Sequence, residues 1–138
     1  MIRVLLADDR DAVRAGIAQL LANYHDMDLV AQAVDGAAAV RLSRETNPDV
    51  VLMDLVMPEM DGIEATRQIL AHKPTALIIV LTVFLERDSV FKAIDAGAVG
   101  YLIKGSDPAE LIDGIRAAMV GDSAFCQEAV RVLASRVG

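Results

Sequence analysis

Short apolar runs alternate with segments of helical periodicity five times along this chain, and this alternation constrains the fold more than any other feature. The run at residues 50–53 is apolar throughout, which is typical of a strand covered on both faces in a parallel sheet. Strands are therefore predicted at residues 2–7, 29–33, 50–53, 76–82 and 100–103. Helices are predicted after them, at residues 11–23, 37–46, 62–72, 87–96 and 108–120.

Five strand–helix units in succession require right-handed crossovers and predict an α/β fold, a single (βα)5 doubly wound parallel sheet. The flavodoxin-like strand order 2-1-3-4-5 is expected at this size. Asp11 is expected to cap the first helix. The domain itself is predicted to cover residues 1–121, and residues 122–138 are predicted to form a C-terminal helix or linker.

Composition narrows the function classes. A length of 138 residues suits one domain, and the net charge of -7 argues against nucleic-acid binding by this chain, which would need clustered Lys and Arg. No apolar stretch is long enough to cross a membrane and the N-terminus has no secretory pattern, so a cytoplasmic protein is expected. The lone cysteine, Cys126, cannot form an intrachain disulfide.

Polar side chains follow four of the predicted strands at the point where each strand ends. They are Asp8 and Asp9, Asp54, Thr82 and Lys104. Open α/β sheets bind ligands at the carboxyl ends of their strands, near the point where the strand order reverses. With the order 2-1-3-4-5, the first and third strands flank that point, so the three carboxylates are expected to share one crevice.

Three carboxylates in one crevice repel each other and require a cation. Carboxylates, a backbone carbonyl and waters suit Mg2+, whereas zinc is disfavoured because thiolates and paired histidines are missing. Lys104 adds a fixed positive charge and Thr82 a hydroxyl, both able to hold phosphoryl oxygens. The set therefore predicts phosphoryl transfer, with Asp54 as the nucleophile.

These residues together resemble the receiver domain of bacterial two-component response regulators. The resemblance covers about residues 2–121 in order and spacing, with 28 residues from Asp54 to Thr82 and 22 from Thr82 to Lys104. The segments around Leu81–Thr82 and Gly97–Gly105 resemble the NarL/FixJ subfamily, in which the receiver precedes a LuxR-type helix-turn-helix domain.

The resemblance implies a role for each site residue. Asp54 would accept a phosphoryl group from a sensor histidine kinase, with Lys104 and Thr82 assisting. Asp9 would bind Mg2+ directly and Asp8 largely through water. Asp54 and the backbone carbonyl of Val56 would complete the protein ligands. Thr82 and Tyr101 resemble the family's switch pair, in which the hydroxyl moves toward the phosphoryl group and the ring turns inward behind it.

The resemblance also implies partners and an output. The receiver would catalyse only its own phosphorylation and dephosphorylation, and it would regulate transcription through a DNA-binding domain absent from these residues. A homodimer is expected, through the fourth and fifth units or through the first and fifth helices, and no membrane contact is expected. Val56 is apolar where many relatives are polar, which predicts slow self-dephosphorylation. Gly105 replaces a frequent Pro, so the usual cis bond is not assumed.

Three alternatives remain open at this point. A stand-alone receiver would act by protein–protein interaction alone. A phosphatase of the haloacid dehalogenase type also uses an aspartyl nucleophile, but on a first-strand DxD motif, whereas Asp8 and Asp9 are adjacent. A flavodoxin-like cofactor binder would need a glycine-containing phosphate loop after the first strand, where this chain is acidic.

Overall fold

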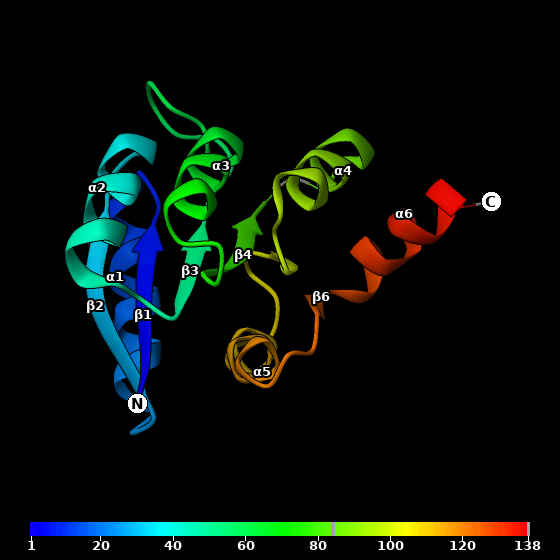
Figure 1. Cartoon of the computed structure of the whole chain (residues 1–138). Coiled ribbons are helices and arrows are strands. Elements are labelled where there is room, and N and C mark those ends of the chain that lie inside the picture. Colours follow the sequence, from blue (N-terminus) through cyan, green and yellow to red (C-terminus); the bar gives the residue numbers. More distant parts are fainter. Residues whose placement is uncertain (84, 138) are drawn as a thin grey trace.

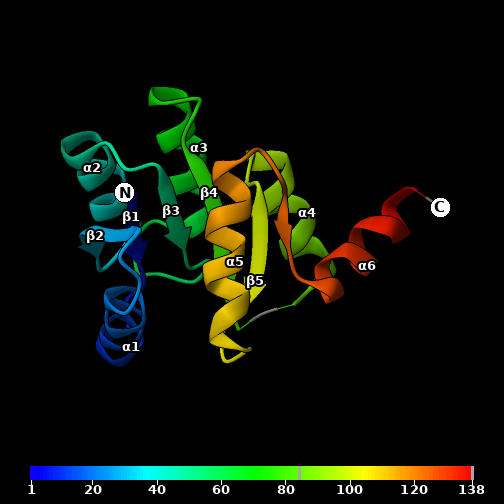
Figure 2. The same ribbon diagram turned by 90° about the horizontal axis from the view of Figure 1, so that it is seen from below.

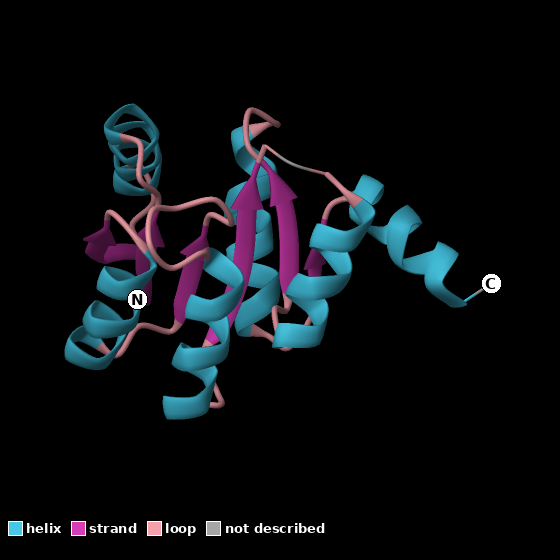
Figure 3. Cartoon of the chain, turned by 90° about the horizontal axis from the view of Figure 1, so that it is seen from above, coloured by secondary structure: helices cyan, strands magenta, loops and turns pink. Residues whose placement is uncertain are grey.

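The chain forms one parallel sheet with helices on both faces. The structure is a computed structural model and describes residues 1–83 and 85–137. Six strands lie in the order β2-β1-β3-β4-β5-β6, and every neighbouring pair is parallel. Figure 3 shows the strands as arrows between the helices. The predicted α/β fold and the order 2-1-3-4-5 are confirmed, and one short strand is added at the edge beyond β5.

The strands and helices have the following bounds. The strands are β1 (Ile2–Ala7), β2 (Met27–Ala33), β3 (Val50–Met53), β4 (Leu77–Thr82), β5 (Gly100–Ile103) and β6 (Ala124–Phe125). The helices are α1 (Asp11–Ala22), α2 (Gly36–Thr46), α3 (Gly62–His72), α4 (Arg87–Ala96), α5 (Pro108–Met119) and α6 (Gln127–Val137). Every predicted strand and helix is present, with ends that agree within two residues.

The core lies on both sides of the sheet. Helices α1 and α5 cover one face, and α2, α3 and α4 cover the other (Figures 1 and 2). Side chains alternate along β1: Val4 and Leu6 pack in one apolar cluster, and Leu5 and Ala7 pack in the other. All four residues of β3 are buried, as its continuous apolar sequence predicted.

Side-chain caps start three of the helices. The carboxylates of Asp35, Asp61 and Asp107 accept hydrogen bonds from the backbone N–H groups of Ala38, Glu64 and Ala109 respectively. The prediction that Asp11 caps α1 is wrong. Asp11 is the first helical residue and forms an ion pair with Arg14, while Arg10 is the capping residue and makes no side-chain cap bond.

Strand β6 was not foreseen from the sequence. It pairs with the start of β5, with Gly100 opposite Ala124 and Tyr101 opposite Phe125. A Cβ atom at Gly100 would lie 2.6 Å from the Ala124 carbonyl oxygen, so only glycine allows this close approach. Two residues carry no detectable periodicity, which explains why the strand could be recognised only in the folded chain.

Candidate functional site

Asp8 and Asp9 directly follow β1 and lie at the carboxyl-end edge of the sheet. Asp8 is buried, and its carboxylate accepts a hydrogen bond from the Arg10 backbone N–H at 2.9 Å. Its backbone carbonyl accepts a second bond, 2.7 Å long, from the Arg14 guanidinium on α1. Asp9 is exposed. The first carboxylate is thus fixed in the fold, and the second faces solvent.

Asp54 stands at the end of β3, next to β1. Its backbone N–H donates to the carbonyl of Ala7 at 3.0 Å, and its carboxylate accepts from the Leu55 backbone N–H at 2.9 Å. Only 6% of the residue is exposed. Gly62, at the start of α3, packs directly against the Asp54 backbone, because a Cβ there would lie 2.0 Å from the Asp54 carbonyl oxygen.

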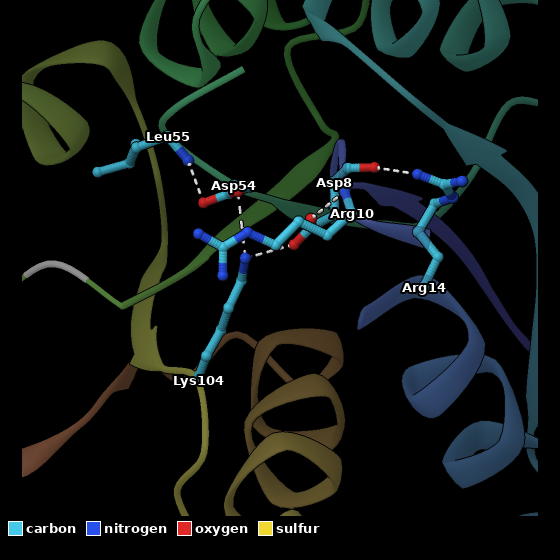
Figure 4. A network of polar contacts seen from close by, with 6 residues as sticks. All are labelled: Asp8, Arg10, Arg14, Asp54, Leu55 and Lys104. Atoms are coloured by element: carbon cyan, nitrogen blue, oxygen red, sulfur yellow. Dashed lines mark hydrogen bonds and ion pairs between the residues drawn. The ribbon is translucent and has the colours of Figure 1, made fainter. Parts of the chain in front are cut away.

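Lys104 links the two buried carboxylates. Its ammonium lies 3.1 Å from Asp54 Oδ2 and also forms an ion pair with Asp8 Oδ2 (Figure 4). Its backbone N–H donates to the carbonyl of Thr82 at 2.8 Å, which ties the end of β5 to the end of β4. The described residues contain no cis peptide bond, so the Lys104–Gly105 bond is trans.

Burial sets the ionisation of Asp54. Loss of solvation raises the pKa of this carboxyl above its ordinary value, and the nearby charge of Asp8 raises it further. The Lys104 ammonium opposes both effects but does not cancel them. Three carboxylates beside one ammonium leave the site with an excess of negative charge, which a further cation would relieve.

The donor set fits a divalent cation that prefers oxygen ligands. One carboxylate oxygen each from Asp8, Asp9 and Asp54 lie within 4.8 Å of one another. Hard oxygen donors without thiolate or imidazole are the ligands that Mg2+ and Ca2+ prefer. Val56 lies in the loop after Asp54, two residues further on, with its side chain 60% exposed.

Thr82 lies on β4, the strand next to β3, and Tyr101 lies on β5, the strand beyond β4. Both are fully buried. Thr82 ends β4, and Tyr101 occupies the middle of β5, so its ring already lies inside the core. Burial raises the pKa of the Tyr101 phenol well above its ordinary value, and the Cys126 thiol and the Glu86 carboxylate raise it further.

The structure thus brings the predicted residues to neighbouring strand ends, with Asp8, Asp9, Asp54 and Lys104 in direct proximity. Two contributors were missed. Arg14 carried no distinguishing signal, because an arginine in an amphipathic helix is usually a solvated surface residue. Gly62 was read as loop punctuation after Asp61, and its close contact with Asp54 depends on how α3 packs.

Residues 4–116 match the protein family described as "Response regulator receiver domain". The chain belongs to this family. It is similar to the transcriptional regulatory protein LiaR of Bacillus subtilis (strain 168), with 52% identity over 122 residues, covering 88% of this chain and 58% of LiaR. The receiver thus spans little more than half of that curated relative.

Two solved receivers extend the comparison. A LuxR-family response regulator from Aurantimonas sp. SI85-9A1 has a TM-score of 0.91 and 39% identity, covering 99% of this receiver and 98% of that chain. The isolated REC domain of RcsB from Salmonella enterica serovar Typhimurium, solved with the phosphomimetic BeF3-, has a TM-score of 0.86 and 26% identity, covering 95% and 97%. The resemblance to LuxR-family receivers is therefore confirmed.

Membership of this family makes the receiver a signalling switch rather than a classical enzyme. It also favours the receiver over the phosphatase and the flavodoxin-like cofactor binder. Among the described residues, no helix has the length and apolar character that a membrane span requires.

Proposed function

We propose that this receiver is switched on when Asp54 accepts a phosphoryl group from the phosphohistidine of a sensor histidine kinase. One observation carries the proposal: Asp54 is a buried carboxylate at a strand end, 3.1 Å from the Lys104 ammonium and grouped with two further carboxylates. A lone surface aspartate would have neither the cation nor the acidic neighbours. Phosphoryl transfer depends on such positioned charges more than on covalent chemistry by the protein.

The transfer balances with groups that the receiver and kinase supply. A carboxylate oxygen of Asp54 forms a bond to phosphorus while the bond from phosphorus to the histidine nitrogen breaks. The electron pair of the broken bond goes to that nitrogen, which takes a proton from solvent water to give neutral imidazole. Lys104 would then donate to a phosphoryl oxygen in place of its present contact with Asp54. Thr82, at the adjacent strand end, would offer its hydroxyl to another.

Asp8, Asp9, Asp54 and the backbone carbonyl of Val56 would hold Mg2+. The bound cation would offset the charge of the carboxylates and of the phosphoryl oxygens. Catalysis by the receiver would be limited to its own phosphorylation and dephosphorylation. The grouping of three carboxylate oxygens within 4.8 Å supports this assignment.

The phosphoryl group would act through the switch pair. It adds about -1.5 to -2 charge and three strong acceptors at Asp54. Thr82 would respond by moving toward these acceptors, and the Tyr101 ring would be held inward behind it. Both side chains are fully buried, so they cannot move freely within the packed core. This supports a switch between discrete arrangements of the two side chains.

Transcription control is the output that we propose, by analogy with LiaR, which is a transcriptional regulatory protein. Residues 1–121 would be the phosphoacceptor domain, and 122–138 would lead toward a DNA-binding domain outside this chain. The protein would work in the cytoplasm, away from membranes, and would form a homodimer when phosphorylated. Action as a stand-alone receiver through protein contacts is the alternative.

The proposal is tested with a small phosphodonor and Mg2+, followed by intact-mass measurement. The wild-type receiver is expected to gain the mass of one phosphoryl group, and Asp54→Asn is expected to gain none. Asp113→Asn, which removes an exposed carboxylate on α5, is the matched control and should behave as wild type. Equal phosphorylation of Asp54→Asn and wild type would refute Asp54 as the acceptor.

A further inference from the structure

The segment that follows α5 is bonded directly to the strand carrying Tyr101. Tyr101 pairs with Phe125 of β6, and the Cys126 backbone N–H donates to the Tyr101 carbonyl at 2.9 Å. The helix α6 starts at the next residue, and Ala129 in its first turn is fully buried. The end of the chain is therefore integrated into the fold at the position of the proposed switch residue.

The far end of α6 is fastened to α4. The Arg136 guanidinium donates two hydrogen bonds to the Asp95 carboxylate, 3.0 and 2.9 Å long. Arg136 also lies over the Phe91 ring, with its Cζ 4.5 Å from the ring centroid, and Arg87 approaches the same ring at 5.3 Å. Figures 1 and 2 both show α6 running beside α4 at the edge of the sheet.

Strand β6 and helix α4 both contact β5, the strand that carries Tyr101. Without β6, β5 would be the edge strand of the sheet, and one side of its backbone would face solvent. Tyr101 shares one buried cluster with Cys126 and with Ala129 of α6. Glu86, the residue before α4, and Cys126, the residue before α6, both raise the pKa of the phenol. Residues of α4 and of the segment after α5 thus belong to the apolar cluster that surrounds the Tyr101 ring.

We propose that β6 and α6 form a latch that holds the Tyr101 ring in its buried position, with Arg136 and Asp95 as positioning residues. The inference rests on the proposed function, in which the inward ring accompanies the phosphorylated state. Latch closure and occupation of the acidic site would then favour each other, because coupling between two sites is reciprocal. The segment leading out of the receiver would read the switch directly through the Tyr101 backbone.

The first test measures burial of Tyr101 without any ligand. The chain has two tyrosines and no tryptophan, so Tyr24→Phe leaves Tyr101 as the only strong fluorophore. An exposed ion pair alone contributes little, so the charge at Arg136 is reversed rather than removed. In this background Arg136→Glu should raise the acrylamide quenching constant about twofold, since local opening exposes the ring.

Two controls separate positioning from general charge effects. Arg131→Glu makes the same charge change on the same helix. Arg131 is exposed and has no ion pair among residues 1–83 and 85–137, so this variant should leave quenching unchanged. Asp95→Lys combined with Arg136→Glu restores opposite charges and should return quenching toward the wild-type value. Circular dichroism should show that all variants remain folded.

The second test measures beryllofluoride binding with Mg2+ in the same variants. Arg136→Glu should weaken binding roughly fivefold through the lost coupling, while Arg131→Glu binds as wild type. Unchanged quenching in Arg136→Glu, or increased quenching with unchanged beryllofluoride affinity, would overturn the latch. If wild type failed to bind beryllofluoride, the proposed function would fail instead, and the quenching result would still decide whether α6 positions Tyr101.

Discussion

The Lys104 ammonium lies 3.1 Å from Asp54 Oδ2 while it also pairs with Asp8. One cation therefore stands between two buried carboxylates. A pair of unit charges about 4 Å apart interacts by on the order of 4 kcal/mol at an effective dielectric of about 20, so the repulsion that Lys104 offsets is substantial. The same side chain would be the nearest fixed donor for a phosphoryl group on Asp54.

Lys104→Gln should weaken beryllofluoride binding to the receiver. Loss of a hydrogen bond to a charged group corresponds to about 10- to 100-fold in affinity. Mg2+ alone should bind at least as well as to wild type, because a competing positive charge has been removed. Titration calorimetry measures both affinities. Lys92→Gln, at an exposed lysine on α4, is the control, and equal beryllofluoride affinity in both variants would count against a donor role for Lys104.

Gly62→Ala should destabilise the receiver by about 2 kcal/mol, the usual scale of overpacking. The new Cβ would lie 2.0 Å from the Asp54 carbonyl oxygen and 3.0 Å from the Leu55 Cα, and both are backbone atoms that cannot rotate away. The β3–α3 loop must shift, so phosphorylation should slow as well. Urea unfolding and the rate of phosphorylation from a small phosphodonor measure the two effects.

Gly16→Ala is the matched control for that substitution. Gly16 lies in α1, is exposed, and has no atom within 4 Å of the new Cβ position. Alanine is favoured over glycine inside a helix by roughly 0.5–1 kcal/mol, so this variant should be slightly more stable than wild type. A loss of stability at Gly16 equal to that at Gly62 would show that contact with Asp54 is not the cause.

Val56 should make the phosphorylated receiver long-lived. Its exposed, apolar side chain follows Asp54 by two residues and cannot orient an attacking water. Val56→Asn should speed loss of the phosphoryl group about tenfold, because a polar side chain can assist proton transfer from water. Time-resolved mass measurement gives the rate. Val120→Asn, at a more exposed valine far along the chain, is the control and should not change the dephosphorylation rate. A phosphoryl half-life of only seconds in the wild-type receiver would contradict the slow loss expected from Val56.

The Asp26–Arg116 pair should add stability that depends on pH. A hydrogen bond from the Arg116 guanidinium lowers the pKa of the Asp26 carboxyl. A lowered folded pKa gives a contribution that is complete above the unfolded value of about 4 and is lost as the pH falls through the folded value. The urea midpoint of Asp26→Asn should therefore lie below that of wild type at pH 7, and the difference should vanish in acid.

Asp122→Asn provides the comparison for this pH series, since Asp122 is an exposed carboxylate in the turn after α5. Its unfolding midpoint should follow wild type at every pH. A difference between Asp26→Asn and wild type that stayed constant down to the acid range would mean that the substitution acts through something other than the ion pair.

Periodicity and strand-end chemistry were enough to predict the fold and to predict that Asp8, Asp9, Asp54 and Lys104 gather at one edge of the sheet. The apolar run of β3 placed Asp54 at a strand end, and the order of strands placed Asp8 next to it, because parallel strands present their carboxyl ends at one edge. Apolar runs and the polar residues at their ends are local patterns, so they can be read from the sequence.

Only the tertiary structure decided how the site is supported. Three contacts join residues of different elements and form only when those elements pack. They are the bond from Arg14 to the Asp8 carbonyl, the contact of Gly62 with Asp54 and the pairing of Ala124 with Gly100. The expected cap at Asp11 failed for a local reason, because its carboxylate pairs with Arg14 three residues further along the same helix. Sequence by itself determined which groups reach the edge of the sheet, whereas packing determined their partners, because contacts between different elements leave no periodic pattern in the sequence.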